Sequence, residues 1–504
     1  MALAEDRIPV IVGVGQVNDR PEEPAAGLDS LGLMVEALRR ADEERKWLPG
    51  LSAVLTVAQI AFPDLGDCSP KVAEAIGATP SLCRQTKYPM GDSPVRLLNE
   101  AANMIASGEA ASVAITGGEA LRTAAARARE AGPKNTKVDA VRASSIARKQ
   151  RYTDLFRLTS PVDIYPLYEN ACRAEWGQSL EEAQRESGQI WSDFSRVADG
   201  NDGAWIHAPR TVEEIITADA SNRPISFPYT KLMVANSSVN QGAAFIVASL
   251  AAAKAAGMAE SDLIYIGRGA HAEEPANVMA RDVFSHSVSL SESLSKALEF
   301  NDLTIEDMDY AELYSCFPCM PKMARRVIGW PLEKPMSVFG GLTFGGGPIA
   351  NYMSHAVVEM VLRLRKSGRY GFLFANGGFA TYTHSIVIGR DPKLANCLPH
   401  DFDVQAEAEI SRGAVPAFEE GYQGEGVIET YTVHYKRDGS VRFGVIVGRT
   451  PDGARRFLAK IPAEDEAGIA FLTDGAVEPV GTTGQALPGA EAEQNVMFWQ
   501  CNLA

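Results

Sequence analysis

One local pattern occurs twice in this chain, about 260 residues apart, and restricts its fold more than any other feature. In the first copy a helix is predicted to begin at Ser93-Pro94, with the serine as N-cap and the proline at the first helical position. Apolar residues then recur every three to four positions, and Gly108 ends the helix. The apolar run 112–116 follows as a buried strand and leads into Gly117-Gly118.

The second copy repeats these four features in the same order. A helix is predicted to start at Gly347-Pro348, Gly368 ends it, and the strand 370–374 leads into Gly377-Gly378. Near the N-terminus, strands are also predicted at 9–14 and 54–61, with an amphipathic helix between them. Strands that alternate with helices predict an α/β domain with a largely parallel sheet, and the repeat predicts an internal duplication.

The remaining segments differ from the two copies in amino-acid composition and in predicted secondary structure. Residues 120–225 are polar, basic and helix-rich, whereas three β-rich runs after about residue 395 are separated by Asp-Gly turns. A length of 504 residues corresponds to about three domains. We therefore expect a first half at 1–255, including an insertion at about 120–225, a second half at 256–394 and an all-β domain at 395–504.

Composition excludes several classes of protein. With 46% hydrophobic and 22% charged residues the chain has the balance of an ordinary globular protein. A net charge of −16 argues against nucleic acid and anionic membranes as partners. Seven cysteines do not suggest a disulfide framework, and no apolar run is long enough to span a membrane. The N-terminus lacks the pattern of a signal peptide, so the expected location is cytoplasmic.

One segment of this acidic chain is strongly basic. Residues 122–157 hold ten Lys/Arg against three Asp/Glu. Such an island favours a polyanionic ligand, and a solvated, mobile arm is the equally open alternative. If it binds an anion, the candidate residues are Arg142, Arg148, Lys149 and Arg151.

Short motifs alone assign no chemistry. Gly13-Val14-Gly15 lacks the third glycine of a dinucleotide loop, and the glycine-rich run 340–348 lacks the Lys-Ser/Thr of a P-loop. Cys316 and Cys319 have the spacing of half a zinc site, but no second pair completes it, so we expect structural cysteines and no metal. His355 and His384 follow the glycine motifs of the second copy, where each is either a core histidine or a catalytic group.

Taken together, five segments resemble the thiolase superfamily. They are the helix-strand-GGE stretch 93–119, NSSVNQGAA at 236–244, ELYSCF at 312–317, GGLTFGGGP at 340–348 and NGGFAT at 376–381. Residues 5–390 are most similar to sterol-carrier-protein-type thiolases, and the tail resembles the extra OB-like domain of one bacterial thiolase-like group. The resemblance implies two βαβαβαββ halves layered α-β-α-β-α, an inserted loop domain that holds the nucleotide of coenzyme A, and an OB-like β domain.

The catalytic side chains of the family are missing from these motifs. The position of the nucleophilic cysteine, which thiolases place at a helix N-terminus, is Gly91. Gly347 stands at the histidine of the GHP motif, and Tyr314 at the histidine of the HDCF segment. The second cysteine falls near Asn376, where there is no thiol. A covalent acyl-enzyme at the usual position is therefore excluded.

Two functions remain open. The first is an acyl-CoA acyltransferase similar to acetyl-CoA acetyltransferases, in which the thiol of coenzyme A attacks a β-keto acid or β-ketoacyl substrate directly. This chemistry needs an oxyanion site and a base, for which the candidates are His384 (the first choice), His355, Tyr314, Cys316 and Asn376. The alternative is a catalytically inactive protein that binds CoA or acyl groups.

Either function implies coenzyme A as ligand, with an acyl or β-keto partner and no metal. Besides the four basic residues, the expected binding positions are Gly91, Asp92, Ser93, Ser237, Phe344, Gly347 and Gly378. The resemblance also makes a homodimer an expectation.

Overall fold

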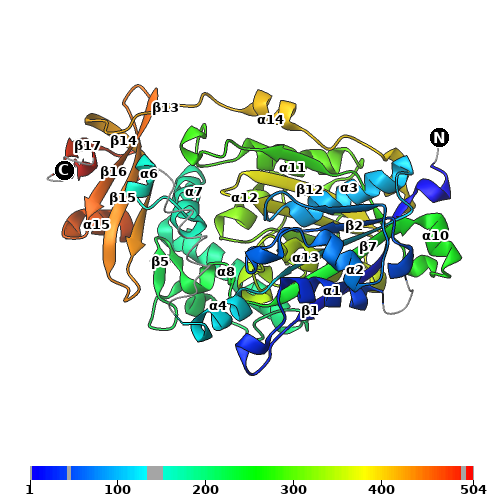
Figure 1. Ribbon diagram of the computed structural model, residues 1–504. Helices are drawn as coiled ribbons and strands as arrows, with labels where there is room; N and C mark the ends of the chain where they lie inside the picture. The colour runs from blue at the N-terminus through cyan, green and yellow to red at the C-terminus, as the bar shows by residue number, and fades with distance from the viewer. Residues whose placement is uncertain (1–2, 43–46, 133–150, 490–494, 503–504) are drawn as a thin grey trace.

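The computed structural model describes residues 3–42, 47–132, 151–489 and 495–502 (Figure 1). Of the four basic candidates only Arg151 falls in these ranges, where it is exposed. Arg142, Arg148 and Lys149 lie outside the described residues. No helix in the described ranges is both long and apolar enough to cross a membrane.

The first half of the body is a five-stranded part of a larger sheet. Its strand order is β3-β2-β4-β7-β1, with β2 parallel to β3 and β4, and with β7 antiparallel to β4 and β1. The strands are β1 (Pro9–Asn18), β2 (Ala53–Thr56), β3 (Leu82–Gln85), β4 (Ser112–Glu119) and β7 (Gln241–Ser249).

The second half repeats this arrangement of neighbours. β10 runs parallel to β11, β12 is antiparallel to β11, and β8 and β9 are antiparallel to β12. These strands are β8 (Ile264–Ile266), β9 (Ala270–Glu273), β10 (Tyr310–Leu313), β11 (Tyr370–Gly377) and β12 (Tyr382–Gly389). The order β10-β11-β12-β8 matches β2-β4-β7-β1, which confirms the duplication. β1 and β8 pair through Val10–Tyr265 and Ile11–Ile264, so one ten-stranded sheet runs through both halves.

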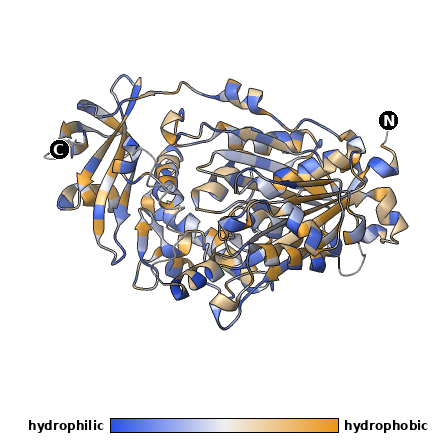
Figure 2. Cartoon of the chain, in the orientation of Figure 1, coloured by the Kyte–Doolittle hydropathy of each residue, from blue (hydrophilic) through white to orange (hydrophobic). Residues whose placement is uncertain are grey.

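Helices complete a five-layered body. α3 (Ser93–Ser107) and α13 (Tyr352–Lys366) form the middle layer, because each packs against strands of both halves. α1 (Ser30–Ala41) and α2 (Ser69–Ala75) cover the outer face of the first half, and α11 (Val288–Glu299) and α12 (Cys319–Ile328) that of the second. α10 (Leu250–Ala255) follows β7. The α-β-α-β-α layering is confirmed, and Figure 2 shows hydrophobic residues concentrated on the central strands.

Two helix starts differ from the expected ones. Asp92, not Ser93, is the N-cap residue of α3, so Ser93 is the first helical residue and Pro94 the second. α13 begins at Tyr352, because the backbone after Pro348 first makes a turn in which the Asn351 N–H donates to the Pro348 carbonyl. The proline therefore marks a turn before the helix rather than its first residue.

A helical insertion lies between the body and the C-terminal domain (Figure 1). Its elements are α4 (Leu121–Glu130), α6 (Tyr152–Leu155), α7 (Pro161–Glu175), α8 (Leu180–Asp199), α9 (Val212–Ile216), β5 (Pro224–Ser226) and β6 (Tyr229–Thr230). β5 does not belong to the body, because Ser226 pairs with His434 of the C-terminal domain.

The C-terminal domain is a closed five-stranded barrel. β14 (Gly424–Tyr435), β15 (Val441–Arg449) and β16 (Arg455–Pro462) pair in sequence, and β18 (Met497–Cys501) and β17 (Thr483–Pro488) close the ring back to β14. α15 (Glu466–Thr473) covers it. The barrel has its own core, which includes Tyr431, Phe457 and Trp499. α14 (Gln405–Ser411) and the short β13 (Ala417–Phe418) lie on the segment that connects it to the body. The boundary near residue 395 stays a prediction.

Candidate functional site

The position of the missing nucleophile is filled by neighbouring groups. Gly91 lies just before α3, at the end of the body where β4 and β11 end. A Cβ built on Gly91 would lie 2.2 Å from the Asn376 carbonyl oxygen and 2.5 Å from the Tyr314 hydroxyl. At Gly347, whose N–H donates to the Asn236 carbonyl at 2.8 Å, an added Cβ would lie 3.2 Å from backbone oxygens. Neither glycine opens onto free space.

Tyr314, which stands where the family has a histidine, is held by a second tyrosine. Its ring meets that of Tyr352 edge-on, with the centroids 5.9 Å apart. The Tyr352 hydroxyl donates to Glu312 at 2.6 Å, and the Ser337 hydroxyl and the Val338 N–H donate to the same carboxylate. Burial raises the pKa of Tyr314 well above 10 and that of Glu312 to about 7. Tyr314 is thus a neutral, rigidly packed phenol.

The other predicted side chains of this cluster form hydrogen bonds with α7. The amide nitrogen of Asn376 donates to the Tyr165 hydroxyl at 2.9 Å, and that hydroxyl donates to the Gly378 carbonyl at 3.1 Å. The amide oxygen of Asn376 is buried and has no hydrogen-bond partner among the described residues. Cys316 lies beside them, and burial raises the pKa of its thiol to about 12. The structure therefore brings Gly91, Tyr314, Cys316 and Asn376 together.

His355 does not belong to this cluster. It lies on α13, fully buried, with its ring stacked on Phe339 at 5.0 Å between centroids. Its Nδ1 lies 2.8 Å from the amide oxygen of Gln16 on β1, and its Nε2 has no partner within the described part of the chain. Burial lowers the pKa of His355 to about 3. It is a neutral histidine of the middle layer.

His384 is also enclosed between layers. It pairs with Ala375 and His271 in the sheet, and its ring packs on Phe402 at 5.0 Å. An added Cβ at Gly269 would meet both His384 and Asn99, which places the imidazole roughly two turns into α3 rather than at its N-terminus. Within the described residues neither ring nitrogen has a hydrogen-bond partner. Burial, and then the nearby His271, lower the pKa of His384 well below 6.5.

This burial predicts a pH effect on stability. The imidazole of His384 stays neutral in the folded protein but takes up a proton near pH 6.5 when the chain unfolds, so stability is lost as the pH falls below about 6.5. The free energy of unfolding of the natural protein should fall between pH 7 and pH 5.5. We expect His384→Met to reduce this fall by about 1 kcal/mol, measured by urea unfolding at both pH values. If the free energy of unfolding fell equally with pH in the variant and in the natural protein, His384 would not be a buried neutral imidazole.

Asp92 and Ser93 lie beside the cluster and line a cavity of about 490 Å³. Arg84, Arg96, Glu273 and Tyr382 also line it. Asp92 is 3% exposed, one of its carboxylate oxygens has no hydrogen-bond partner among the described residues, and burial raises its pKa. The cavity opens beside the N-terminus of α3, and Asp92 is its most deeply buried ionisable group.

The remaining predicted positions differ in exposure. Phe344 is fully buried in the glycine-rich loop, Ser237 is half-buried, and Gly378 is exposed at a φ of +67°. The sequence reasoning missed Tyr165 and Tyr168, whose hydroxyls donate to the carbonyls of Gly378 and Phe379. Their spacing of three residues in a helix that begins with Ser-Pro was the available signal.

A side chain at Gly91 is expected to destabilise the fold. Its φ lies outside the left-handed region, so the cost of Gly91→Ala or Gly91→Cys comes from contact with the Asn376 carbonyl and Tyr314. We expect a loss of about 1–3 kcal/mol in urea unfolding, and no acetyl adduct of Gly91→Cys by mass spectrometry after acetoacetyl-CoA.

Gly50→Ala is the control for this prediction, because an added Cβ there would meet nothing within 4 Å. Adding Tyr314→Phe to Gly91→Ala should restore only part of the loss, since the backbone oxygen remains. Full stability and an acetyl adduct in Gly91→Cys would contradict the packing.

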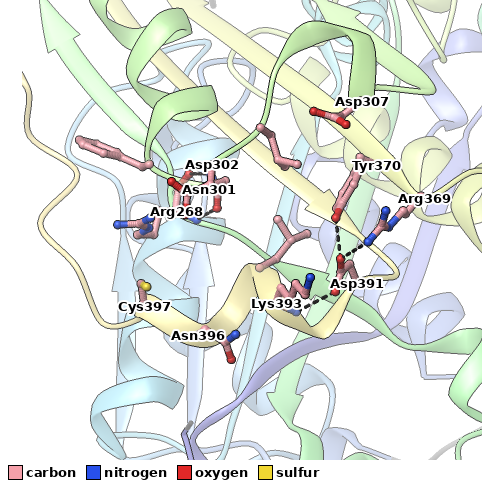
Figure 3. Close-up of a pocket in the computed structure, with 13 residues that line it drawn as sticks. Arg268, Asn301, Asp302, Asp307, Arg369, Tyr370, Asp391, Lys393, Asn396 and Cys397 are labelled. Carbon is pink, nitrogen blue, oxygen red and sulfur yellow. Dashed lines mark hydrogen bonds and ion pairs between the residues drawn. The ribbon is translucent and has the colours of Figure 1, made fainter. Parts of the chain in front are cut away.

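A second polar cavity, of about 480 Å³, lies at the opposite end of the strands (Figure 3). Asp391 accepts hydrogen bonds there from the Tyr370 hydroxyl at 2.6 Å and from Arg369 at 2.5 Å. Tyr370 begins β11, whereas Asn376 is near its end, so this cavity is remote from the cluster at Gly91. The described residues contain no group of three or more His, Cys, Asp or Glu side chains that could hold a metal ion.

The fold is similar to that of known thiolase-like proteins. A family model described as the additional C-terminal domain of thiolase-like protein type 1 matches residues 403–488. A monomeric SCP2-thiolase-like protein type 1 from Mycobacterium smegmatis has a similar structure, with 29% sequence identity and a TM-score of 0.81. The match covers 99% of this chain and 100% of that chain. No curated protein sequence matches significantly.

More distant structures match about three quarters of the chain. Human mitochondrial 3-ketoacyl-CoA thiolase is 16% identical, with a TM-score of 0.55 over 77% of this chain and 100% of that chain. An Ltp2-ChsH2(DUF35) aldolase is 17% identical, with a TM-score of 0.57 over 76% of this chain and 98% of that chain. The chain therefore has a thiolase-like fold followed by an additional C-terminal domain.

Proposed function

We propose that this protein binds coenzyme A or an acyl-CoA in its thiolase-like body and forms no covalent acyl-enzyme. The packing at Gly91 carries the proposal, because the Tyr314 hydroxyl and the Asn376 carbonyl occupy the space that a nucleophile would need. A human 3-ketoacyl-CoA thiolase of the same fold has been crystallised in complex with CoA, which supports the ligand.

The protonation states at the site favour binding over acid–base catalysis. Burial raises the pKa values of Tyr314 and Cys316, so neither is ionised near neutral pH to act as a base. His355 and His384 are neutral but enclosed away from the cluster. A general base must reach the proton that it removes, and these imidazoles have no such path in the packed layers.

The second candidate is CoA-dependent cleavage or formation of a β-keto carbon–carbon bond, as in an acyltransferase. The CoA thiolate would attack the β-carbonyl carbon, the bond to the α-carbon would break, and the enolate released would take a proton. The unpartnered amide oxygen of Asn376 and the raised pKa of Asp92, both beside Gly91, favour this function. A cytoplasmic location and a homodimer stay predictions, and the similar M. smegmatis protein is described as monomeric.

One pair of measurements separates the candidates. Calorimetric titration with CoA and acetyl-CoA is expected to show saturable binding to the full chain. Incubation of CoA with a panel of β-keto acids and β-ketoacyl thioesters is expected to give no acyl-CoA. Acyl-CoA formation that is lost in Asp92→Asn would establish the acyltransferase, and absence of binding would overturn both candidates.

A further inference from the structure

Two arginines flank one buried tryptophan at the carboxyl edge of the first half. Arg20 follows β1, and Arg122 lies in the first turn of α4, directly after β4. β1 and β4 both run antiparallel to β7, so they end at the same edge of the sheet. The guanidinium carbon of Arg20 lies 4.0 Å from the centre of the Trp205 ring, and that of Arg122 lies 5.7 Å from it.

Among the described residues neither guanidinium forms an ion pair. Arg20 donates to the Ala204 carbonyl at 3.4 Å, and the chain supplies no carboxylate within 4.0 Å of either arginine in the described ranges. Burial, and then the charge of Arg122, lower the pKa of Arg20. Two like charges that interact with each other, in a protein of net charge −16, leave a local excess of positive potential. An anion bound to both arginines would reduce this repulsion.

The same residues border the two loops that enclose the candidate site. The backbone N–H of Trp205 donates to the carbonyls of Phe344 and Gly345, at 3.1 and 3.0 Å. The Arg122 N–H donates to the Val239 carbonyl at 3.3 Å, in the loop that contains Ser237. Arg20 and Arg122 are therefore fixed next to two loops that carry predicted site residues.

We propose that Arg20 and Arg122 bind a phosphate group of a ligand at this carboxyl edge of the first half. A guanidinium group donates several hydrogen bonds in one plane, which suits phosphate oxygens. The ring of Trp205 packs against both guanidinium groups and so limits their movement. The site deepens the proposed function and rests on it, because coenzyme A is the phosphorylated ligand proposed there.

The test compares ligands that differ in their phosphates. CoA, dephospho-CoA, pantetheine and inorganic pyrophosphate are titrated into the full chain and into Arg20→Gln/Arg122→Gln. We expect the double variant to bind CoA at least about tenfold more weakly, with a smaller dependence on salt and unchanged binding of pantetheine. Arg185→Gln/Arg196→Gln is the matched control, because both arginines lie exposed on α8 beside a carboxylate. Thermal melting checks that each variant folds.

The outcomes separate the site from the function. Equal CoA affinity in the Arg20/Arg122 variant and in the natural protein would overturn the site and leave the proposed function standing. If CoA does not bind but pyrophosphate binds in an Arg20- and Arg122-dependent manner, the function fails and the phosphate site stands. If neither CoA nor pyrophosphate binds, both fail. Comparing the affinities for CoA and dephospho-CoA shows which phosphate the arginines contact, because dephospho-CoA lacks the 3′-phosphate but keeps the pyrophosphate.

Discussion

Replacing Lys322 by methionine is expected to lower the free energy of unfolding by about 3–5 kcal/mol. Lys322 is fully buried on α12, and its ammonium lies 2.5 Å from Glu169 of α7 and donates to the Ala183 carbonyl of α8 at 2.8 Å. Without it, the Glu169 carboxylate remains in the core, and among the described residues only the Tyr229 hydroxyl still donates to it, at 2.8 Å. Urea unfolding of the full chain measures the loss.

A second substitution identifies the cause. Glu169→Gln removes the unpaired charge but keeps an acceptor for Tyr229, so the double variant should regain most of the stability lost in Lys322→Met. Lys296→Met is the control, because that lysine pairs with the mostly exposed Glu299 on the surface and should change stability by less than about 1 kcal/mol. A double variant as unstable as the single one would show that packing, not charge, is responsible.

The buried Arg456 of the barrel is expected to be of similar importance. It donates to the carbonyls of Met279, Arg281 and Asp282 in the body at 2.6–3.1 Å, and to Glu429 of the barrel. Arg456→Met leaves the carbonyls of Met279 and Arg281 without this donor, whereas that of Asp282 keeps Arg449, and we expect a loss of about 3–5 kcal/mol.

The variant should also loosen the contact between barrel and body. Limited proteolysis is then expected to cleave the connecting segment around α14 faster than in the natural protein. Arg455→Met is the matched control, because the neighbouring Arg455 is half exposed and pairs with Glu419 at 2.7 Å. Equal cleavage rates in the two variants would show that other contacts hold the barrel in place.

Much of the architecture could be predicted from the sequence, but the prediction of a largely parallel sheet was wrong, because most strand pairs of the body are antiparallel. The pattern around Ser93, Gly108 and Gly117 predicted α3 and β4 because proline, glycine and apolar spacing act locally. The pairing of β5 with the barrel could not be foreseen, since Ser226 and His434 are 208 residues apart and neither carries a local signal.

The candidate site was predictable in its positions but not in its packing. The resemblance brought Gly91, Tyr314, Cys316 and Asn376 to one place, as the structure does. It could not show that the Asn376 carbonyl fills the space beside Gly91, because a glycine in a sequence does not reveal whether it lies next to open space or to backbone. His355 and His384 were named from their distance to glycine motifs, and sequence distance does not tell which layer a side chain faces.

The continuous sheet through β1 has a consequence for the synthesis of the protein. β1 is made before both of its partners, β7 and β8, which follow more than 220 residues later. At about 5–20 residues per second, the ribosome needs roughly 10–50 s to produce β7 after β1. During that interval both backbone edges of Pro9–Asn18 lack their native partner strands, so their N–H and C=O groups are open to non-native pairing until the middle of the chain has been translated.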